Sequence, residues 1–330
     1  MVKSSLISAS KMVMRGFVNY FISRPLVISF EVTHNCVCNC KHCDKGGPSP
    51  NERRMKPEEY KRFLEIYNPV SVQLSGGEPL WRDDIEEVVS QLRSFDERIP
   101  YIVFVTNGAL LTEEKFIKLA KLGIDQFSIS LDFPDERHDD FRRYKGLYKH
   151  LENLVPKIAK LNISDIVLNM AITHENYKDI SSVARRAFEW GVAISYSAYS
   201  ILRTGDPQFC ISDEKELEVL RSEILNVIEM KRHRQAVRNP ERVLWGTYEF
   251  FRDGGKPNCS AGVRFFVVRP DGKINPCSMF PDSIYETQEE AIKKFVDDNK
   301  CDKCYVAIRA YSDGGFFDLL KDSVATYFSR

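Results

Sequence analysis

The run Cys36-Val-Cys-Asn-Cys40-Lys-His-Cys43 places four cysteines within eight residues, and the interpretation of the whole chain starts from it. No stretch has the apolar core and small-residue cleavage site of a secretory signal. No run approaches the roughly 20 apolar residues that cross a bilayer. Clustered cysteines in a reducing compartment bind metal more often than they form disulfides. We therefore expect a cytoplasmic metalloprotein.

The composition is that of a globular protein. The chain has 330 residues, of which 43% are hydrophobic and 28% charged. Lysine plus arginine and aspartate plus glutamate both number 47, so the formal net charge is zero. A general nucleic-acid binder needs a basic surplus to neutralise phosphates. We therefore expect no nucleic-acid partner.

From residue 26 onward, β-rich runs alternate with segments of helical period. Strands are expected at 26–32, 70–75, 101–106, 126–131, 166–172 and 193–199. Parallel neighbours need helical crossovers, so six β-α units predict an α/β fold with a parallel sheet. Ligands bind such sheets at the C-terminal ends of the strands. Four informative segments follow predicted strands there: the cysteine run, Gly76-Gly-Glu-Pro79, Asn107-Gly108 and Asp132.

Cys36, Cys40 and Cys43 have the spacing C-x3-C-x2-C. Iron–sulfur clusters are held by thiolates, and three protein ligands leave one iron of a [4Fe–4S] cluster open. Structural zinc is the alternative, but it normally takes four ligands in two pairs. Cys38 could complete four, although C-x-C-x-C-x2-C is a crowded zinc spacing. We interpret Cys38 as a bystander.

This spacing resembles the signature of the radical S-adenosylmethionine (SAM) superfamily, and the resemblance extends over most of the predicted barrel. It implies a partial (β/α)6 TIM-like barrel in which SAM chelates the open iron. Reductive cleavage of SAM then yields a 5′-deoxyadenosyl radical that abstracts hydrogen from a substrate. The resemblance also implies a reducing partner such as flavodoxin or ferredoxin.

The same resemblance assigns SAM contacts residue by residue. His42 stands where the family usually has an aromatic residue near the adenine, and Gly76, Gly77 and Glu78 resemble the element that binds the methionine ammonium. Ser130 and Asp132 resemble residues that contact the ribose or carboxylate. His138-Asp139 followed by Arg142 resembles the H-D-x-x-R segment of a subgroup with C-terminal cluster domains. Asn107 and Asn169 match by position.

A second cysteine group flanks a predicted β-hairpin that turns at Asp271-Gly272. Its members are Cys259, Cys277, Cys301 and Cys304. Cys210 stands apart, and we expect it to have a structural role or none, with replacement of one ligand as the alternative. Four thiolates could close on one metal centre, and zinc remains open here. The pattern resembles the twitch domain, a shortened SPASM domain, which implies one fully ligated auxiliary [4Fe–4S] cluster. Such a cluster would transfer electrons and favour net oxidation.

The segment 213–252 is predicted to be helical and is locally basic. Its cations are Lys231, Arg232, His233, Arg234, Arg238 and Arg242. A solvated helix face is the favoured interpretation, and a site for a substrate carboxylate or phosphate is the alternative.

Both ends of the chain predict amphipathic helices. The stripe over 5–22 contains Met14, Phe17, Val18, Phe21 and Ile22. The C-terminal stripe contains Phe316, Leu319, Leu320, Val324, Tyr327 and Phe328. We expect both to pack on the barrel; the alternative is peripheral contact with a membrane surface.

The sequence thus predicts four regions: a helix at 1–24, the barrel at 25–205, a helical connector at 206–258, and a twitch-type β-hairpin/helix domain with a terminal helix at 259–330. The expected function is oxidation or bond formation on a small-molecule or lipid substrate. The alternatives are a peptide-modifying maturase and a non-catalytic metal-binding protein. Tyr196, Tyr199 and Arg203 are the expected substrate-side residues.

Overall fold

The fold is described from a computed structural model that covers residues 6–96, 100–233 and 235–328. Eight strands form one sheet in the order β6-β5-β4-β3-β2-β1-β7-β8. The strands are β1 Val27–Thr33, β2 Ser71–Gly76, β3 Tyr101–Thr106, β4 Gln126–Ser130, β5 Asp165–Ile172, β6 Ala193–Ala198, β7 Phe265–Val268 and β8 Ile274–Asn275. All neighbouring pairs are parallel except β7 and β8. The predicted α/β fold with a mostly parallel sheet is confirmed.

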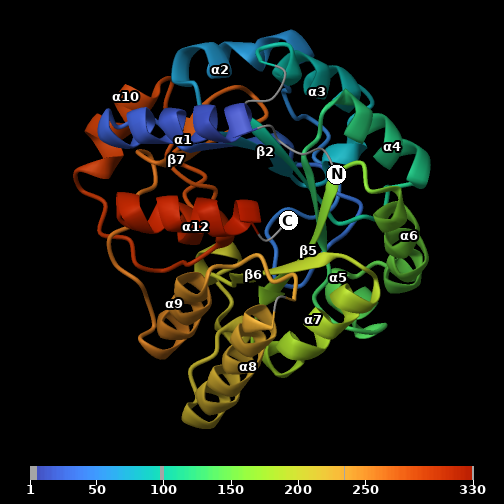
Figure 1. The fold of residues 1–330 in the computed structure, drawn as a ribbon. Coiled ribbons are helices and arrows are strands. Elements are labelled where there is room, and N and C mark those ends of the chain that lie inside the picture. The colour runs from blue at the N-terminus through green and yellow to red at the C-terminus, as the bar shows by residue number, and fades with distance from the viewer. Residues whose placement is uncertain (1–5, 97–99, 234, 329–330) are drawn as a thin grey trace.

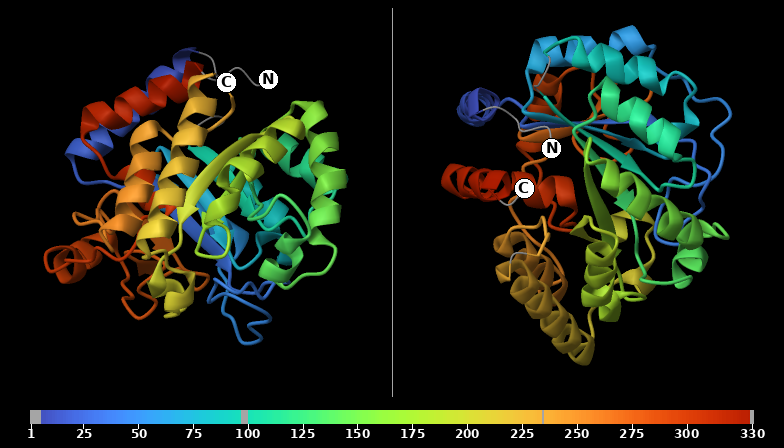
Figure 2. Two further views of the ribbon diagram at one scale, coloured as in Figure 1. Left: turned by 90° about the horizontal axis from the view of Figure 1, so that it is seen from below. Right: turned by 45° about the vertical axis from the view of Figure 1, so that its right-hand side comes forward.

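Most of the helices cover the convex side of this curved sheet, and the two terminal ones lie across its open side (Figures 1 and 2). The helices are α1 Leu6–Phe21, α2 Lys61–Tyr67, α3 Ile85–Arg93, α4 Glu113–Leu122, α5 Arg137–Arg142, α6 Leu147–Leu161, α7 Ile180–Glu189, α8 Glu214–Arg232, α9 Glu241–Arg252, α10 Gln288–Ala291, α11 Ala307–Ser312 and α12 Phe316–Phe328. Thr112 caps α4 as predicted, since its hydroxyl accepts from the Lys115 amide at 3.2 Å.

The strands divide their side chains between two faces. Phe30 packs on Tyr60 and Phe63 beside α2, and Phe127 packs on Phe116 of α4, so this set faces the helices. The alternate residues face the concave side. In β3 every second residue is buried and the others are partly accessible. Because strand side chains alternate with period two, the core lies between sheet and helices, and the concave face stays partly open.

The predicted hairpin of the second cysteine group is β7 and β8, which pair antiparallel at Val267–Asn275 and Val268–Ile274. β7 also pairs in parallel with β1, from Val27–Phe265 to Phe30–Val268. The hairpin therefore continues the barrel sheet directly beside the strand that leads into the first cysteine loop.

The two terminal helices lie side by side across the open side of the barrel (Figures 1 and 2). The Phe316 ring contacts the rings of Phe17, Tyr20 and Phe21 at centroid distances of 5.3–5.7 Å. α1 meets the barrel through Asn19, whose side chain donates to the Pro25 and Asn68 carbonyls.

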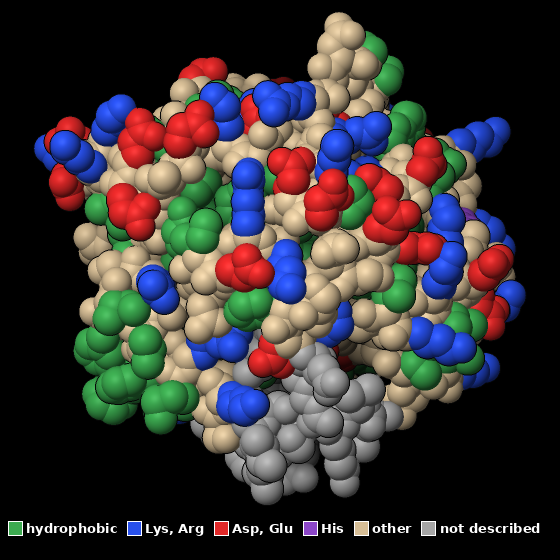
Figure 3. Space-filling view, turned by 90° about the horizontal axis from the view of Figure 1, so that it is seen from above, with side chains coloured by type: hydrophobic (Ala, Val, Ile, Leu, Met, Phe, Trp, Pro, Cys, Tyr) green, Lys and Arg blue, Asp and Glu red, His purple; other side chains and the backbone are tan. Residues whose placement is uncertain are grey.

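The expectation that the α1 stripe packs on the barrel is wrong. Met14 is 64% exposed and Phe21 61%, and Phe17, Val18 and Ile22 are exposed too. The side of α1 that faces the barrel is instead the polar side around Asn19, because the Asn19 amide can donate hydrogen bonds to the backbone carbonyls beside it. Figure 3 shows apolar side chains gathered on the surface of the molecule near its edge. The side chains of Val324, Tyr327 and Phe328 lie outside the described residues.

The basic segment contains two helices, α8 and α9, and its cations are paired locally. Arg232 binds Glu241 at 2.9 Å, Arg238 binds Asp165 at 2.7 Å, and Arg242 binds Asp322 at 2.6 Å. Arg234 lies outside the described residues. This pairing favours a structural role over an anion site. No helix of the described segments is long and apolar enough to span a bilayer.

Candidate active site

The first cysteine loop leaves the C-terminal end of β1 and folds back on itself. The Cys36 amide donates to the Gly47 carbonyl at 3.0 Å, and the Cys43 amide donates to the Cys40 carbonyl at 3.3 Å. Cys36 and Cys40 are buried, and Cys43 is half-buried. Glu52, which the sequence interpretation missed, braces the loop entrance, because its carboxylate accepts from the Thr33 hydroxyl at 2.6 Å and from the His34 amide.

The thiols of this loop differ in acidity. The buried Cys38 thiol hydrogen-bonds to both neighbours, which lowers the pKa of Cys36 and brings that of Cys40 to about 6, while its own pKa rises. The nearby Arg142 guanidinium also favours the Cys40 thiolate. Burial raises the pKa of Cys43. The thiolate is the form that binds iron, and the lowered pKa values of Cys36 and Cys40 favour that form.

Gly76 and Gly77 let the β2 loop lie directly against the β1 loop. Gly76 has φ +125°, and a Cβ there would overlap the Thr33 carbonyl. A Cβ at Gly77 would overlap the carbonyls of His34 and Asn35. The Gly77 amide donates to the Thr33 carbonyl at 2.7 Å. Any side chain at these positions would push the two loops apart.

Glu78 links the loop after β2 to the end of β3 through hydrogen bonds. Its carboxylate, which is fully buried, accepts from the Thr106 hydroxyl at 2.7 Å, the Asn107 amide at 2.8 Å and the Leu80 amide at 3.1 Å. Burial raises the pKa of Glu78 to about 7. Three of about four acceptor positions of the carboxylate are thus used within the protein. Asn107 continues this chain of contacts, since its side-chain amide lies 3.5 Å from the Cys36 sulfur.

Asp132 and Arg142 meet as a buried ion pair beside the cysteines. The Arg142 Nε lies 2.6 Å from the Asp132 carboxylate, which also accepts from the Ala171 amide at 3.0 Å. The Arg142 Nη1 lies 3.8 Å from the Cys40 sulfur. His138 accepts from the Asp132 amide at 3.1 Å, and burial lowers the pKa of His138 to about 4. Asp132 therefore positions a cation against a cysteine ligand.

His42 presents a neutral aromatic ring beside the loop. It stacks on Phe141 with a centroid distance of 4.5 Å and an interplanar angle of 9°. Burial lowers the pKa of His42 to about 3. Its Nδ1 is buried and has no hydrogen-bond partner within the described parts of the chain. A buried polar atom without a partner is costly, so this nitrogen fits a site that a ligand completes.

The remaining predicted residues fall in different places. Asn169 lies on the concave face and donates to the Ser195 hydroxyl at 2.7 Å, and Ser130, on β4, is half-buried. Tyr196 is a correction: it is 1% exposed, and its hydroxyl donates to the Ile180 carbonyl at the start of α7. Because β6 alternates, Tyr196 faces the helices while Ser195 and Ser197 face the concave side.

Tyr199 and Arg203 follow β6. The Tyr199 hydroxyl contacts Thr204 at 2.6 Å, and its ring packs on Phe209. Arg203 extends between the two cysteine groups: its Nη1 lies 2.9 Å from Asp44, next to Cys43, and its Nη2 lies 3.4 Å from Ser278, next to Cys277. Of the three expected substrate-side residues, only Arg203 thus reaches from one cysteine group to the other.

The second cysteine group surrounds one pocket. Its lining includes Cys259, Cys277, Cys301 and Cys304. Apolar side chains such as Phe265 and Met279 complete the wall, and burial raises the pKa of Cys259 to about 12. Arg309, another residue missed at the sequence level, is fully buried and places Nη1 3.8 Å from the Cys304 sulfur. Cys210 instead packs against an aromatic cluster that includes Phe209.

Comparisons with known proteins agree with this geometry. A family model described as "Radical SAM superfamily" matches residues 30–187. A curated "AdoMet-dependent heme synthase" of Methanosarcina barkeri is 32% identical over 189 residues, which is 55% of this chain and only 52% of that protein. A "Probable GTP 3',8-cyclase" of Methanothermobacter marburgensis is 25% identical over 81% of this chain and 88% of that protein.

Among solved structures, Streptococcus suis SuiB bound to S-adenosylmethionine matches with a TM-score of 0.64 at 21% identity, over 88% of this chain and 68% of that one. This likeness concerns the fold. The family model and the curated relatives support the radical SAM superfamily, and the chain is an enzyme. That superfamily implies a [4Fe–4S] cluster and SAM.

Proposed function

We propose that this enzyme binds a [4Fe–4S] cluster through Cys36, Cys40 and Cys43 and cleaves SAM reductively to oxidise its substrate or form a bond within it. When bound, the cluster would supply one electron to SAM, whose C–S bond would break to give methionine and a 5′-deoxyadenosyl radical able to abstract hydrogen. The observation that carries the proposal is the buried loop itself, in which two of three thiols have lowered pKa values and a glycine pair holds the next loop against it.

The chain's own residues have distinct tasks in this proposal. Arg142, fixed by Asp132, provides positive charge beside Cys40 and so favours the thiolate. Asn107 donates toward Cys36. His42 offers a flat neutral ring to the adenine, with Phe141 behind it. Ser130 and Asn169 remain proposed contacts for SAM, as do the backbone groups at Gly76 and Gly77.

We further propose that the second cysteine group holds an auxiliary [4Fe–4S] cluster. Four thiols surround a cavity rather than a point. Within the described segments, no three Cys, His, Asp or Glu side chains are arranged to hold a single metal ion. Zinc needs its ligands about 2.3 Å from one centre, whereas a four-iron cage spaces them around itself. A fully ligated cluster would accept an electron from the substrate and so favour net oxidation.

Anaerobic reconstitution tests these proposals. The expected result is about eight irons and matching sulfide per chain, with 5′-deoxyadenosine formed from SAM and dithionite, or from flavodoxin or ferredoxin as the reducing partner. About four irons plus one zinc would contradict the auxiliary cluster alone. Absence of SAM cleavage by fully loaded protein would support the non-catalytic metal-binding alternative.

Two substrate classes remain proposals: a small molecule or lipid, and a peptide. The exposed stripe on α1 favours contact with a membrane surface as a second proposal, because aromatic and apolar side chains beside Lys11 and Arg24 suit the lipid interface. Co-sedimentation with anionic liposomes tests it, with Phe17→Ser/Phe21→Ser as the variant. A cytoplasmic location and the division into four regions remain predictions.

A further inference from the structure

Alongside apolar residues such as Val103, Val105 and Val167, the concave face of the barrel carries many hydroxyl and amide side chains. They include Ser29, Gln73, Ser75, Ser130, Asn169 and Ser197. Ser29 and Ser75 lie 2.9 Å apart across β1 and β2, and most of this face is partly accessible. Bulky branched side chains usually fill such barrels. A polar and partly open lining favours a hydrophilic ligand, because hydrocarbon placed there would leave polar groups unpaired.

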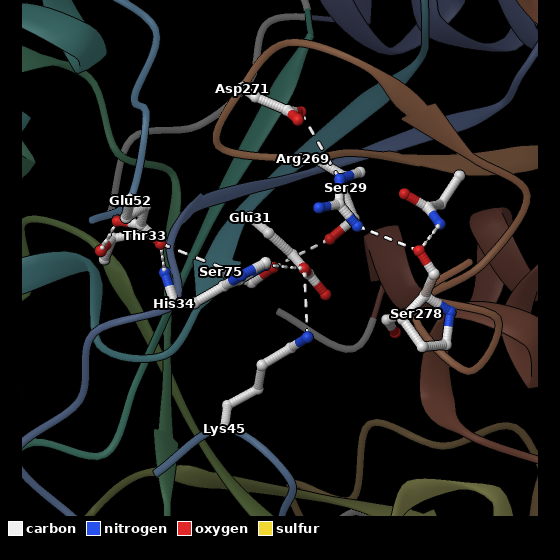
Figure 4. Close-up of polar contacts among 12 residues, drawn as sticks. Ser29, Glu31, Thr33, His34, Lys45, Glu52, Ser75, Arg269, Asp271 and Ser278 are labelled. Atoms are coloured by element: carbon white, nitrogen blue, oxygen red, sulfur yellow. Dashed lines mark hydrogen bonds and ion pairs between the residues drawn. The ribbon is translucent and has the colours of Figure 1, made fainter. Parts of the chain in front are cut away.

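Charged groups gather where this face meets the first cysteine loop. Figure 4 shows Glu31 of β1 with His34 and Lys45 directed toward it. The His34 Nε2 lies 2.7 Å from the Glu31 carboxylate. The Lys45 side chain is only 13% exposed, yet its ammonium lies 3.8 Å from Glu31 and 3.7 Å from Asp44. Both distances exceed those of ordinary hydrogen bonds, so Lys45 can bind another acceptor.

Arg203 brings a second cation to the same place. One edge of its guanidinium binds Asp44 at 2.9 Å, while Nη2 is 3.4 Å from the Ser278 hydroxyl. A planar guanidinium can hold a carboxylate on one edge and a second anion on the other. Because Asp44 adjoins Cys43 and Ser278 adjoins Cys277, a ligand held by Arg203 would lie between the two cysteine groups.

We propose that the barrel binds a small hydrophilic substrate through an anionic group, a carboxylate or a phosphate, held by Lys45 and Arg203. The inference rests on the proposed function and narrows its substrate class. Glu31 and Asp44 already contact His34 and Arg203, and the Lys45 ammonium and the Arg203 guanidinium each keep further N–H donors for the anion. The side chains of Ser29, Gln73 and Ser75 then bind the neutral part of the substrate by hydrogen bonds.

Fractionated extract tests the substrate class with the reconstituted wild-type enzyme. Aqueous metabolites are separated on an anion exchanger at neutral pH, the organic phase is kept, and each fraction is assayed for stimulation of 5′-deoxyadenosine formation. The expected stimulating compound is retained by the exchanger. Phosphatase treatment then distinguishes a phosphate, which loses activity, from a carboxylate, which keeps it.

The outcomes separate the two levels of the proposal. Stimulation confined to the uncharged flow-through or to the organic phase overturns the anionic substrate but not SAM cleavage. Stimulation by no fraction, together with no 5′-deoxyadenosine at all, contradicts the proposed function itself.

Substitution tests the two cations with the retained compound. Lys45→Met and Arg203→Met should each raise KM by roughly 10- to 100-fold, with a smaller change in kcat, since a charge-assisted hydrogen bond is lost. Arg203→Lys should bring KM part of the way back to the wild-type value, because lysine keeps the positive charge but lacks the paired N–H donors of the guanidinium. Lys118→Met, an exposed change beside Glu86 on the outer helices, is the matched control. An unchanged KM in both Met variants would overturn the assignment.

Discussion

The two cysteine groups are built in opposite ways. The first is local: three predicted ligands lie within eight residues of one loop, and polar groups surround them. The second is assembled from a hairpin and a distant turn, and its four thiols line a largely apolar cavity. Thiol acidity follows this difference, because the pKa of Cys40 is lowered to about 6 and that of Cys259 is raised to about 12.

The two groups nevertheless share one feature, a buried arginine beside a cysteine sulfur. Arg142 and Arg309 each place a guanidinium nitrogen 3.8 Å from a cysteine sulfur, and each is held by an aspartate, at 2.6 and 2.8 Å. A buried cation beside a thiolate stabilises negative charge that desolvation would otherwise oppose. Thiol protonation is thus controlled by several polar neighbours in the first group, whereas in the second group Arg309 is the buried cation beside the Cys304 thiol.

The largest expected effect comes from removing one ligand from each group. Cys40→Ser should lose the first cluster and SAM cleavage, leaving about four irons per chain, while Cys304→Ser should lose only the second cluster. Separate electron paramagnetic resonance signals and iron analysis check this. Cys210→Ser is the control. If either single variant lost both clusters, the two groups would not be independent centres.

Replacing Arg142 and Arg309 in turn compares how much each buried arginine contributes to stability. Arg142→Met leaves the fully buried Asp132 without its cation, and we expect the free energy of unfolding to fall by about 3–5 kcal/mol. Arg309→Met should cost less, since the Asp313 side chain is 18% exposed and water can solvate it. Denaturant unfolding measures both. Adding Asp132→Asn to Arg142→Met should restore part of the loss, because the unpaired charge is removed.

Glu78, beside the first group, makes the stability of the protein depend on pH below neutrality. Its folded pKa of about 7 lies above the model-peptide value near 4.3. The unfolded chain therefore binds fewer protons between these values, and stability falls as pH rises from about 4.5 to 7, by up to about 3 kcal/mol.

Glu78→Gln removes the titration, so its stability relative to wild type should improve steadily from pH 5 to pH 7. Thermal unfolding at several pH values checks the slope. A constant difference between the two proteins across this range would show that Glu78 does not titrate there.

Much of this fold could be predicted from sequence because its signals are local. The six barrel strands, the Thr112 cap and the hairpin turn at Asp271-Gly272 follow from short-range patterns. Arg309 could not be identified in advance, since its partners Lys256, Pro257 and Cys304 meet it only after folding.

The misplacement of Tyr196 had a cause that the sequence itself shows. Ser195, Tyr196 and Ser197 alternate, and strand geometry puts the tyrosine on the opposite face from both serines. The same period-two geometry places Ser29, Gln73 and Ser128 on the concave face. On α1, by contrast, an apolar stripe does not say whether protein or solvent covers it, and here the side near Asn19 meets the barrel.

The smallest expected effect concerns Cys38, the one cysteine of the first loop that is not proposed as an iron ligand. Its buried thiol hydrogen-bonds to Cys36 and Cys40, so Cys38→Ala removes two weak bonds and should cost roughly 1 kcal/mol of stability. Iron content and SAM cleavage should remain. Cys301→Ala, also one of four, should instead lose the auxiliary cluster. If Cys38→Ala halved the iron, all four cysteines of the first loop would be ligands, and the open iron required for SAM would have to be found elsewhere.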